Sequence, residues 1–589
     1  MTTFTELMSP EIDHLDTLRS RLTEEPQALQ FGTSGRRGLL IHLSQLEVFI
    51  NALAELEYLQ TLPATDGGIV RGDPFYFAYD LRPSSTHYID QTPRRGELAQ
   101  AIEAAIREAG MRPVNLGAIP TPALTSFAVD AGKGSIMVTG SHIPFDRNGY
   151  KTNTSCGELL KQHEAPINER VRQVRERVYR QSFDTSAFDV HGLFKDGHRE
   201  LPPASDAARR AYLERYVNFF GAGAVEGLRV LVYQHSAVGR DLLVEILRGV
   251  GAEVFVAGRS ETFVPIDTEN IGADQLATIQ QLFDEARAAH GRIDAVVSTD
   301  GDSDRPLILG VDADGTRLRF FGGDLVGMVT AEFLGADAAV VPISCNDAID
   351  RGPLRAITEA KTRIGSPFVI AGMEAARAKG KRTVCGWEAN GGFLTGSEII
   401  RDGRRLAPLP TRDAVLPILT VLVAARAARV SLIELFDHLP KRFSRAALLK
   451  DFPRPIGLAI VQRFSPKRPD IDAVTFTNDG VLVQTSGRNP APALAEDAAV
   501  FAAIREDLAG FFTANDGFST IHGINFVDGV RVLFTDGDVA HLRPSGNADE
   551  LRIYAVSDTQ QRADAIAALA VAEPDGILRR IERAVGQAS

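Results

Sequence analysis

The sequence is short of cysteine, of long apolar runs and of excess positive charge. It has 3 cysteines in 589 residues, at positions 156, 345 and 385. An odd, widely spaced set of cysteines excludes a disulfide framework and a cysteine-based zinc site. The longest apolar stretch, Ala414 to Ala425, contains a proline and is far shorter than the ~20 residues that cross a bilayer. We therefore expect a protein of a reducing, cytoplasmic compartment with no membrane contact.

The charge balance is acidic. There are 64 Lys plus Arg residues and 76 Asp plus Glu residues, so the formal net charge is −12. This composition lacks the basic footprint of a nucleic-acid-binding protein. The 44% hydrophobic and 24% charged residues are ordinary for a globular protein and exclude a disordered or collagen-like chain. At the usual ~150 residues per domain, the length suggests about four domains.

One pattern recurs along the chain: a short apolar strand, an amphipathic helix, a glycine and another strand. The predicted first strands and helices of its three copies are Phe75–Tyr79 with Gly96–Ala109, Leu228–Tyr233 with Arg240–Val250, and Ala338–Ile343 with Pro353–Ala360. Such alternation predicts α/β layers with largely parallel sheets. After about Ala446 strands predominate and a helix closes the chain, which predicts a small α+β unit. We place the domains at residues 1–205, 206–315, 316–442 and 443–589.

The segment from Val138 to Lys151 is the richest in chemistry. Its glycine and proline residues force a loop after a predicted strand, and Ser141 lies at the tip of that loop beside His142. An exposed serine next to a base can act as a nucleophile, and Lys151 can move a proton. An ordinary turn that contains a serine remains the alternative.

A second loop concentrates negative charge. Asp300, Asp302 and Asp304 follow the predicted strand Ile293–Val297. Three carboxylates so close together repel one another unless a cation neutralises them, and oxygen ligands suit Mg²⁺ or Ca²⁺. Ligands of α/β proteins also gather where parallel strands end, which favours a site. A solvated acidic turn remains the alternative.

Three further glycine-containing loops carry side chains that suit a sugar phosphate. Glu388 and Asn390 can bind hydroxyl groups, and the run from Arg543 to Asn547 can surround a phosphate. The third loop, Phe31–Gly38, offers two arginines. Each of these signals is weak alone.

Together, in this order, the loops resemble those of the α-D-phosphohexomutase superfamily, which includes phosphomannomutases and phosphoglucomutases, and most of all a phosphomannomutase branch. The resemblance covers nearly the whole chain. It rests on the N-terminal, domain-1, phosphoserine, magnesium, sugar and phosphate motifs, which here read Gly32–Gly38, Asp80–Ser85, Pro120–Pro122, Thr139–Pro144, Asp300–Arg305, Gly386–Gly392 and Arg543–Asn547. Asn390 and the run Asn547-Ala548-Asp549 depart from the residues more usual in the family.

This resemblance implies four domains around one cleft, three of them α/β and the last α+β. It implies an isomerase that moves phosphate between O6 and O1 of a hexose, with mannose as the favoured sugar. The reaction would pass through a phosphoserine and a hexose 1,6-bisphosphate, which also serves as activator. The implied catalytic residues are Ser141, His142, Lys151 and Arg37; the implied Mg²⁺ ligands are Ser141, Asp300, Asp302 and Asp304; and the implied substrate-binding residues are Arg305, Glu388, Asn390, Arg543, Ser545, Gly546 and Asn547.

The resemblance leaves the substrate and the assembly open. A glucose or another hexose phosphate would fit the same motifs, and the enzyme would work as a monomer or a homodimer. Two alternatives of other classes are a Mg²⁺-dependent sugar-phosphate phosphatase and a non-catalytic sugar-phosphate sensor. The former would release inorganic phosphate, and the latter would bind its ligand without turnover.

Overall fold

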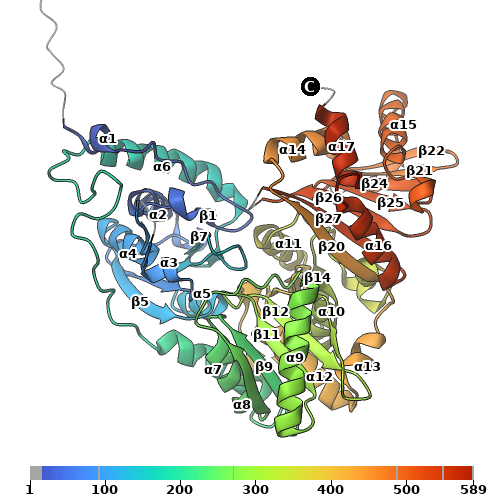
Figure 1. Cartoon of the computed structure of the whole chain (residues 1–589), viewed down its shortest axis with the longest axis horizontal. Helices are drawn as coiled ribbons and strands as arrows, with labels where there is room; N and C mark the ends of the chain where they lie inside the picture. The colour runs from blue at the N-terminus through green and yellow to red at the C-terminus, as the bar shows by residue number, and fades with distance from the viewer. Residues whose placement is uncertain (1–15, 91–92, 270, 486–487, 547–548, 587–589) are drawn as a thin grey trace, which may run out of the picture.

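The computed structural model describes residues 16–90, 93–269, 271–485, 488–546 and 549–586. These residues form four larger sheets, each with its own helices, and the predicted combination of three α/β units and one α+β unit is confirmed. In Figure 1 the first sheet lies in the left lobe, the second and third lie in the lower body, and the fourth lies in the right lobe. The domain boundaries themselves stay a prediction.

The first sheet runs in the order β1-β7-β6-β2-β5. Strand β2 is parallel to β5 and β6, whereas β7 is antiparallel to both β1 and β6. The elements are α1 (Leu18–Arg21), β1 (Arg36–Leu39), α2 (Gln45–Leu59), β2 (Pro74–Tyr79), α3 (Pro83–Thr86), β3 (Tyr88–Ile89), β4 (Arg95–Gly96), α4 (Leu98–Glu108), β5 (Arg112–Ala118), α5 (Thr121–Asp130), β6 (Ser135–Val138), β7 (Arg147–Thr154), β8 (Gly157–Glu158) and α6 (Glu164–Tyr179).

The second and third sheets repeat this mixed arrangement in the orders β10-β9-β11-β12-β13 and β14-β15-β16-β19. Their elements are α7 (Ala207–Phe220), β9 (Arg229–His235), α8 (Arg240–Gly249), β10 (Glu253–Arg259), α9 (Ala273–His290), β11 (Ala295–Thr299), β12 (Pro306–Val311), β13 (Leu318–Phe320), α10 (Gly323–Leu334), β14 (Ala338–Val340), α11 (Ser366–Ala378), β15 (Val384–Trp387), β16 (Phe393–Thr395), β17 (Ile399–Arg401), β18 (Arg404–Leu406), β19 (Leu409–Asp413), α12 (Val415–Ala428) and α13 (Leu432–Asp437).

The fourth sheet has the order β20-β27-β26-β25-β24-β21-β22-β23, and its neighbouring strands pair antiparallel. Its elements are β20 (Phe443–Lys450), α14 (Arg454–Arg463), β21 (Ile471–Thr477), β22 (Gly480–Thr485), β23 (Ala491–Pro492), α15 (Ala495–Ala509), β24 (Ile521–Asn525), β25 (Val530–Phe534), β26 (Val539–Pro544), β27 (Glu550–Ser557), α16 (Gln560–Val571) and α17 (Ile577–Gly586). None of the described helices is long and apolar enough to cross a membrane.

Two predictions about the elements are wrong. The first three sheets are mixed, because in each a parallel strand is followed by an antiparallel return strand: β6 by β7, β11 by β12, and β15 by β16. The helix expected near Pro353–Ala360 is only a short 3₁₀ turn, Pro353–Ile357, and the crossover helix of the third sheet is α11. Pro367 lies in the first turn of α11, where a proline costs no helical hydrogen bond.

The hairpins decide where the chemistry lies. The Ser141 loop joins β6 to β7, the aspartate loop joins β11 to β12, and the Glu388 loop joins β15 to β16. In each hairpin the first strand is also paired parallel with another strand of its sheet. These loops therefore leave the carboxyl ends of parallel strands, where ligands of α/β sheets bind.

Buried apolar side chains fix how the first three units sit together. The largest buried cluster includes Leu124 of α5, Tyr212 of α7, Trp387 of β15 and Leu419 of α12. The fourth sheet has a separate core around Phe501, Phe512 and Ile553. Because one continuous core links the first three units, their loops are held at fixed positions relative to one another.

Candidate active site

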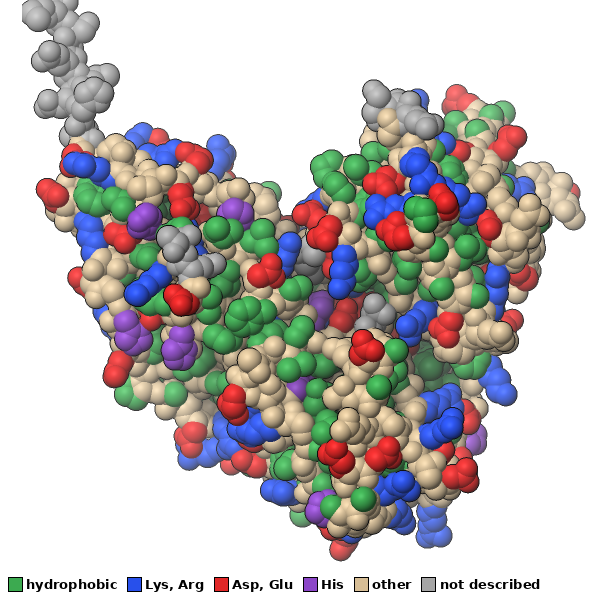
Figure 2. Space-filling model, in the orientation of Figure 1, with side chains coloured by type: hydrophobic (Ala, Val, Ile, Leu, Met, Phe, Trp, Pro, Cys, Tyr) green, Lys and Arg blue, Asp and Glu red, His purple; other side chains and the backbone are tan. Residues whose placement is uncertain are grey.

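The predicted loops meet at one pocket. Its lining comes from all four units and comprises Thr33, Ser34, Arg37, His142, Glu269, Arg305, Ile364, Glu388, Asn390, Arg412, Arg543, Ser545, Gly546, Arg552 and Tyr554. Figure 2 shows the V-shaped notch between the left and right lobes, above the lower body. Residues more than 500 positions apart in the sequence thus face one another.

Ser141 lies on a strained turn. It is fully buried, contrary to the exposed position that we predicted, and its φ is +54°, in the left-handed region that few non-glycine residues adopt. Its backbone N–H donates to Thr139 Oγ1 at 2.7 Å, and its hydroxyl donates to Asp300 Oδ2 at 2.8 Å. The turn therefore directs the hydroxyl at the aspartate loop, and strain of this kind collects at functional sites.

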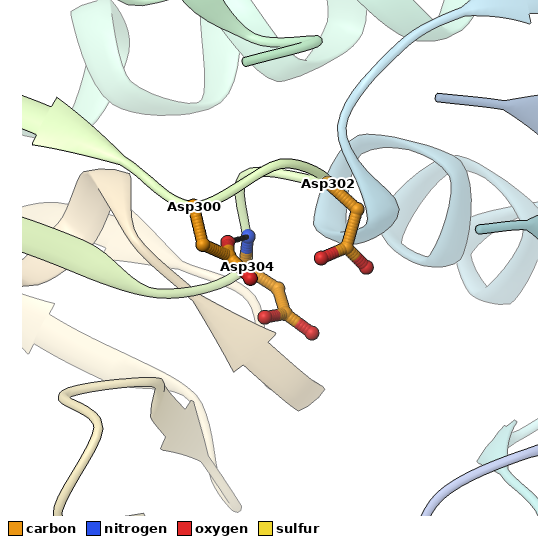
Figure 3. A group of neighbouring side chains, drawn as sticks. All are labelled: Asp300, Asp302 and Asp304. Carbon is orange, nitrogen blue, oxygen red and sulfur yellow. Dashed lines mark hydrogen bonds between the residues drawn. The ribbon is translucent and has the colours of Figure 1, made fainter. Parts of the chain in front are cut away.

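The three aspartates converge on a common point. Asp300, Asp302 and Asp304 have no exposed surface, and one oxygen of each lies within 4.8 Å of the others (Figure 3). This rejects the alternative of a solvated turn. Oδ1 of Asp302 and Oδ1 of Asp304 are buried without a hydrogen-bond partner among the described residues. An oxygen-rich, buried and unsatisfied set of this kind fits a Mg²⁺ ion.

The charge of the trio is partly balanced by Lys151. Its ammonium group donates to Asp302 Oδ2 and to Asp304 Oδ2, both at 2.7 Å. Although burial favours neutral carboxyls, Lys151 holds the pKa of Asp302 below its ordinary value. Burial, together with the charges of Asp302 and Asp304, raises the pKa of Asp300 well above its ordinary value. A cation bound among the three carboxylates would favour the ionised form of Asp300.

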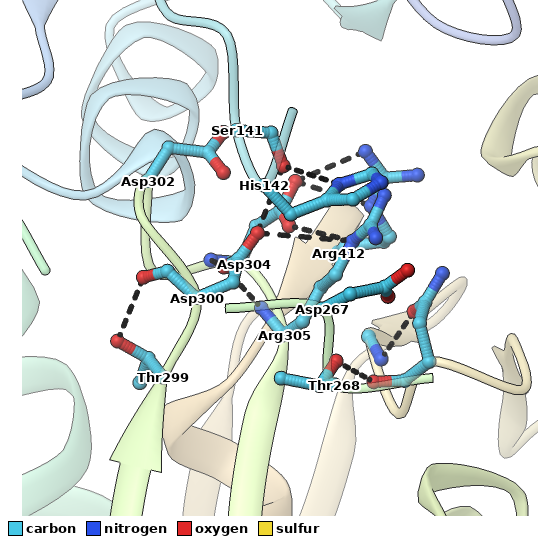
Figure 4. Close-up of polar contacts among 12 residues, drawn as sticks. Ser141, His142, Asp267, Thr268, Thr299, Asp300, Asp302, Asp304, Arg305 and Arg412 are labelled. Atoms are coloured by element: carbon cyan, nitrogen blue, oxygen red, sulfur yellow. Dashed lines mark hydrogen bonds and ion pairs between the residues drawn. The ribbon is translucent and has the colours of Figure 1, made fainter. Parts of the chain in front are cut away.

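Arg412 links the aspartate loop to the Glu388 loop, which we call the sugar loop. It was not among the residues predicted from the sequence. Its Nε and one Nη donate to Asp304 Oδ2 at 3.1 and 3.0 Å (Figure 4), while its other Nη donates to Glu388 Oε2 at 2.9 Å. Burial opposes its charge, yet Asp304 and Glu388 raise the pKa of Arg412 well above its ordinary value. The available signal was an Arg-Asp pair at the end of a short strand, directly before the long apolar helix α12.

A second arginine holds the serine loop. Arg82 is 1% exposed and donates to four backbone carbonyls, those of Ser141, Ile143, Pro144 and Arg147. Thr121, at the start of α5, donates to Asp302 Oδ2 at 2.6 Å. Both residues lie in the motifs Asp80–Ser85 and Pro120–Pro122, which gave the resemblance but no role. These contacts fix the serine loop against the aspartate loop.

Positive charge gathers beside His142. Arg37 Nε and Nη2, together with Arg305 Nε, are buried without a hydrogen-bond partner among the described residues, although Arg305 Nε lies 3.5 Å from Asp304 Oδ1, and both arginines line the pocket. Burial and then the neighbouring Arg305 lower the pKa of Arg37 to about 10. Burial, followed by the charges of Arg305 and Arg37, lowers the pKa of His142 well below its ordinary value, so this histidine is neutral. Unsatisfied guanidinium groups of this kind fit an anionic ligand.

Glu388 and Asn390 reach the pocket from the β15–β16 hairpin. They are 3% and 6% exposed, and both line the pocket. Asn390 Oδ1 accepts the backbone N–H of Gly392 at 2.9 Å, and Arg412 holds Glu388. The side chains are therefore oriented before any ligand arrives.

The phosphate loop faces them from the fourth sheet. Arg543 Nε donates to Asp528 Oδ1 at 3.0 Å, and Arg543, Ser545 and Gly546 all line the pocket. A side chain at Gly546 would come within 2.8 Å of Thr33 Oγ1, so the loop packs closely on the N-terminal loop. Asn547, also predicted to bind phosphate, lies outside the described residues.

Comparison with known proteins identifies the family. Three family models of Phosphoglucomutase/phosphomannomutase match this chain. They are alpha/beta/alpha domain I at residues 28–178, alpha/beta/alpha domain III at 323–443 and the C-terminal domain at 484–573. A phosphomannomutase of Sinorhizobium fredii is 35% identical over 92% of this chain and 98% of its own. This chain belongs to the phosphoglucomutase/phosphomannomutase family. The predicted superfamily, its phosphomannomutase branch and the predicted isomerase class are thereby confirmed.

Other relatives agree. A phosphomannomutase of Salmonella muenchen is 34% identical over 81% of this chain and 84% of its own. Among solved structures, a phosphoglucomutase/phosphomannomutase family protein from Burkholderia thailandensis has a TM-score of 0.59 at 17% identity, covering 96% of this chain and 99% of its own. At that identity the likeness establishes the fold alone.

Proposed function

We propose that this chain interconverts hexose 6-phosphate and hexose 1-phosphate, with mannose phosphates preferred, through a phosphorylated Ser141 and a bound hexose 1,6-bisphosphate. The observation that carries the proposal is the position of the Ser141 hydroxyl, 2.8 Å from Asp300 and directly before His142, which lines the pocket together with Arg37, Arg305 and Arg543. The mannose preference is supported by the names of the two relatives at 35% and 34% identity.

The reaction comprises two transfers that mirror each other. In the first, a sugar hydroxyl loses its proton and attacks the phosphorus of phospho-Ser141; the bond from phosphorus to Ser141 Oγ breaks as the bond to the sugar oxygen forms. The bisphosphate then turns in the pocket, and Ser141 Oγ takes back the other phosphoryl group. Such transfers depend on positioning and on neutralisation of charge. Mg²⁺ held by Ser141, Asp300, Asp302 and Asp304 would supply that neutralisation.

The remaining residues have distinct tasks in this proposal. Lys151 and the neutral His142 accept and return the proton of the attacking hydroxyl. Arg37 and Arg305 contact the phosphoryl group in transit, since their guanidinium groups line the pocket with His142 and carry buried nitrogens without hydrogen bonds. Glu388 and Asn390 bind sugar hydroxyls, and Arg543, Ser545, Gly546 and Asn547 grip the phosphate that is not reacting.

The two alternative functions predict different products. A phosphatase would release inorganic phosphate, and a sensor would show no turnover. Ser141 contacts Asp300, and Lys151 contacts Asp302 and Asp304, which argues against a silent sensor. A reducing, cytoplasmic location agrees with the free cysteines at positions 156, 345 and 385.

The test is a coupled assay of the purified protein with Mg²⁺ and a trace of hexose 1,6-bisphosphate. Mannose 1-phosphate and glucose 1-phosphate are each supplied, and both the 6-phosphate product and inorganic phosphate are measured. We expect the 6-phosphate, formed faster from mannose 1-phosphate. Release of inorganic phosphate in its place, or no turnover of either sugar, would reject the proposal.

A further inference from the structure

A loop that none of the sequence motifs includes also reaches the pocket. It is the chain between β10 and α9, residues 260–272. Ile266 and Thr268 are buried, and Thr268 Oγ1 donates to the backbone carbonyl of Asn390 at 2.8 Å. Figure 4 shows Thr268 directed at the sugar loop. The second unit therefore supports the loop that we propose to bind sugar hydroxyls.

Glu269 lines the same pocket as Glu388, Asn390 and Arg543. Its side chain is 13% exposed, and its Oε2 lies 3.5 Å from an Nη of Arg552 on β27 of the fourth sheet. That distance is longer than the 2.7–3.2 Å of a well-formed hydrogen bond. Arg552 has a closer partner, Glu550, at 2.9 Å. Arg552 thus directs Glu269 towards the pocket, and the carboxyl group of Glu269 can still accept a hydrogen bond from a ligand.

The surroundings of Glu269 favour a hydroxyl as its partner. Burial raises its pKa to about 7; the charges of Arg552 and Arg305 lower it, and those of Asp267 and Glu388 raise it. A carboxyl group in this setting is best matched by an uncharged hydrogen-bond donor, because an uncharged donor loses less solvation free energy on burial than a charged one. Sugar hydroxyls are donors of that kind, and a buried acceptor left without a donor is costly.

We infer that Glu269 is an additional specificity-determining residue that accepts a hydrogen bond from one hydroxyl of the hexose ring. The inference rests on the proposed function, because the ligand is the hexose phosphate of that reaction. It adds a further loop to those that carry the family motifs. Arg552 acts through Glu269 as a positioning residue.

The experiment compares wild type, Glu269→Ala and Glu269→Gln on mannose 1-phosphate and on its analogues that lack a single ring hydroxyl. For wild type, removal of the contacted hydroxyl should lower kcat/KM by about 10- to 150-fold, the range for a hydrogen bond to a charged group. In Glu269→Ala that one analogue should perform as well as the parent sugar, while the other analogues keep their full penalties. Glu261→Gln is the matched control, since Glu261 is 83% exposed on the same loop.

Two outcomes separate the inference from the proposed function. If every analogue keeps its full penalty in Glu269→Ala while wild type is active, the inference is wrong and the proposed function stands. If wild type turns over no hexose phosphate, calorimetry with mannose 6-phosphate and inorganic phosphate decides: Glu269→Ala should weaken binding of the sugar phosphate and leave inorganic phosphate unchanged. Equal weakening of both, or of neither, would overturn the inference.

Discussion

At the scale of single residues, the site depends on charged groups that are buried and paired. The Asp300–Asp304 loop, Lys151, Arg412 and Glu388 form one connected set, and each of these side chains is almost completely buried. Removing one member of such a set leaves its partner buried without a counter-charge, which costs more than the pair contributes. Single substitutions here should therefore affect chemistry and binding strongly.

Ser141→Ala should lose nearly all turnover while it keeps hexose phosphate binding, because the substitution removes the oxygen that carries the phosphoryl group and leaves the arginines in place. Steady-state kinetics, calorimetry and intact-mass analysis check this. Ser182→Ala, at an exposed serine of the same unit, is the control. Full activity of Ser141→Ala together with an unphosphorylated wild type would contradict the assignment.

Asp302→Asn should weaken Mg²⁺ binding by at least roughly 10- to 100-fold. That is the effect of changing a residue that only hydrogen-bonds a metal ligand, and Asp302 is a proposed ligand itself. It should also lower kcat. The fold should persist, because the change relieves repulsion from Asp300 and Asp304. Metal titration of EDTA-treated protein measures the affinity, with Asp314→Asn at an exposed aspartate as control. Full activity of the wild type after EDTA treatment would show that no metal is needed.

Arg543→Ala should raise KM by about 10- to 150-fold, since it removes a charge-assisted contact to phosphate of roughly 1.5–3 kcal/mol. Arg543→Lys should recover only part of this, because an ammonium cannot match two phosphate oxygens at once. The bisphosphate should also escape more often between the two transfers. Kinetics with detection of free bisphosphate tests both effects; an unchanged KM would assign the loop another task.

At the scale of elements, close packing of α10 on β15 positions Glu388. Trp387 is 1% exposed, and its Nε1 donates to the carbonyl of Asp324 in α10 at 3.0 Å. A side chain at Gly327 of α10 would come within 2.2 Å of the Trp387 ring. The glycine is required by this contact, and Glu388 follows Trp387 directly in the chain.

Gly327→Ala should therefore lower the free energy of unfolding by about 1–3 kcal/mol, the cost of overpacking a core. It should also reduce kcat/KM, because a displaced Trp387 moves Glu388. Trp387 is the single tryptophan of the chain, so its fluorescence reports the repacking directly. Gly586→Ala, at a helical glycine with open space around it, should change neither quantity. An unshifted spectrum with wild-type stability would refute this account.

At the scale of the whole molecule, single carboxylates join one unit to another. Glu158 of β8 accepts hydrogen bonds from Ser366 and Thr411 of the third unit, at 2.6 and 2.5 Å. Asp528 of the fourth unit accepts the backbone N–H of Ile364 at 2.9 Å and the Nε–H of Arg543 at 3.0 Å. Asp528 thus holds the proposed phosphate anchor and contacts the opposite wall of the pocket.

Asp528→Asn should raise KM, though by less than Arg543→Ala, because an amide has one oxygen where two acceptors are needed. The double variant Asp528→Asn with Arg543→Ala should be no worse than Arg543→Ala alone, since the first change acts through the second residue. A double-mutant cycle on KM measures this coupling. Additive effects would show that Asp528 acts independently of Arg543.

The sequence alone determined the fold class, the four hairpin loops and most of the candidate site. Strands, helices and glycine-rich turns are encoded by local periodicity. Carboxylates or arginines in short runs indicate which ligands a loop can bind. Hence the aspartate trio, Ser141, Lys151, Glu388, Asn390 and Arg543 were all predicted, and the described structure brings them together. The mixed strand directions were not predicted, because pairing partners are chosen by contacts remote in sequence. The final helix, α17, was not predicted either.

Only the tertiary structure decided which side chains hold the site together. Arg82, Arg412 and Asp528 were given no role from the sequence, and their partners lie between 15 and 164 positions away. Glu269 reaches the pocket only because its loop packs on the sugar loop. Burial has the same origin: local sequence placed Ser141 at an exposed tip, whereas the facing aspartate loop covers it and sets the charge that it meets.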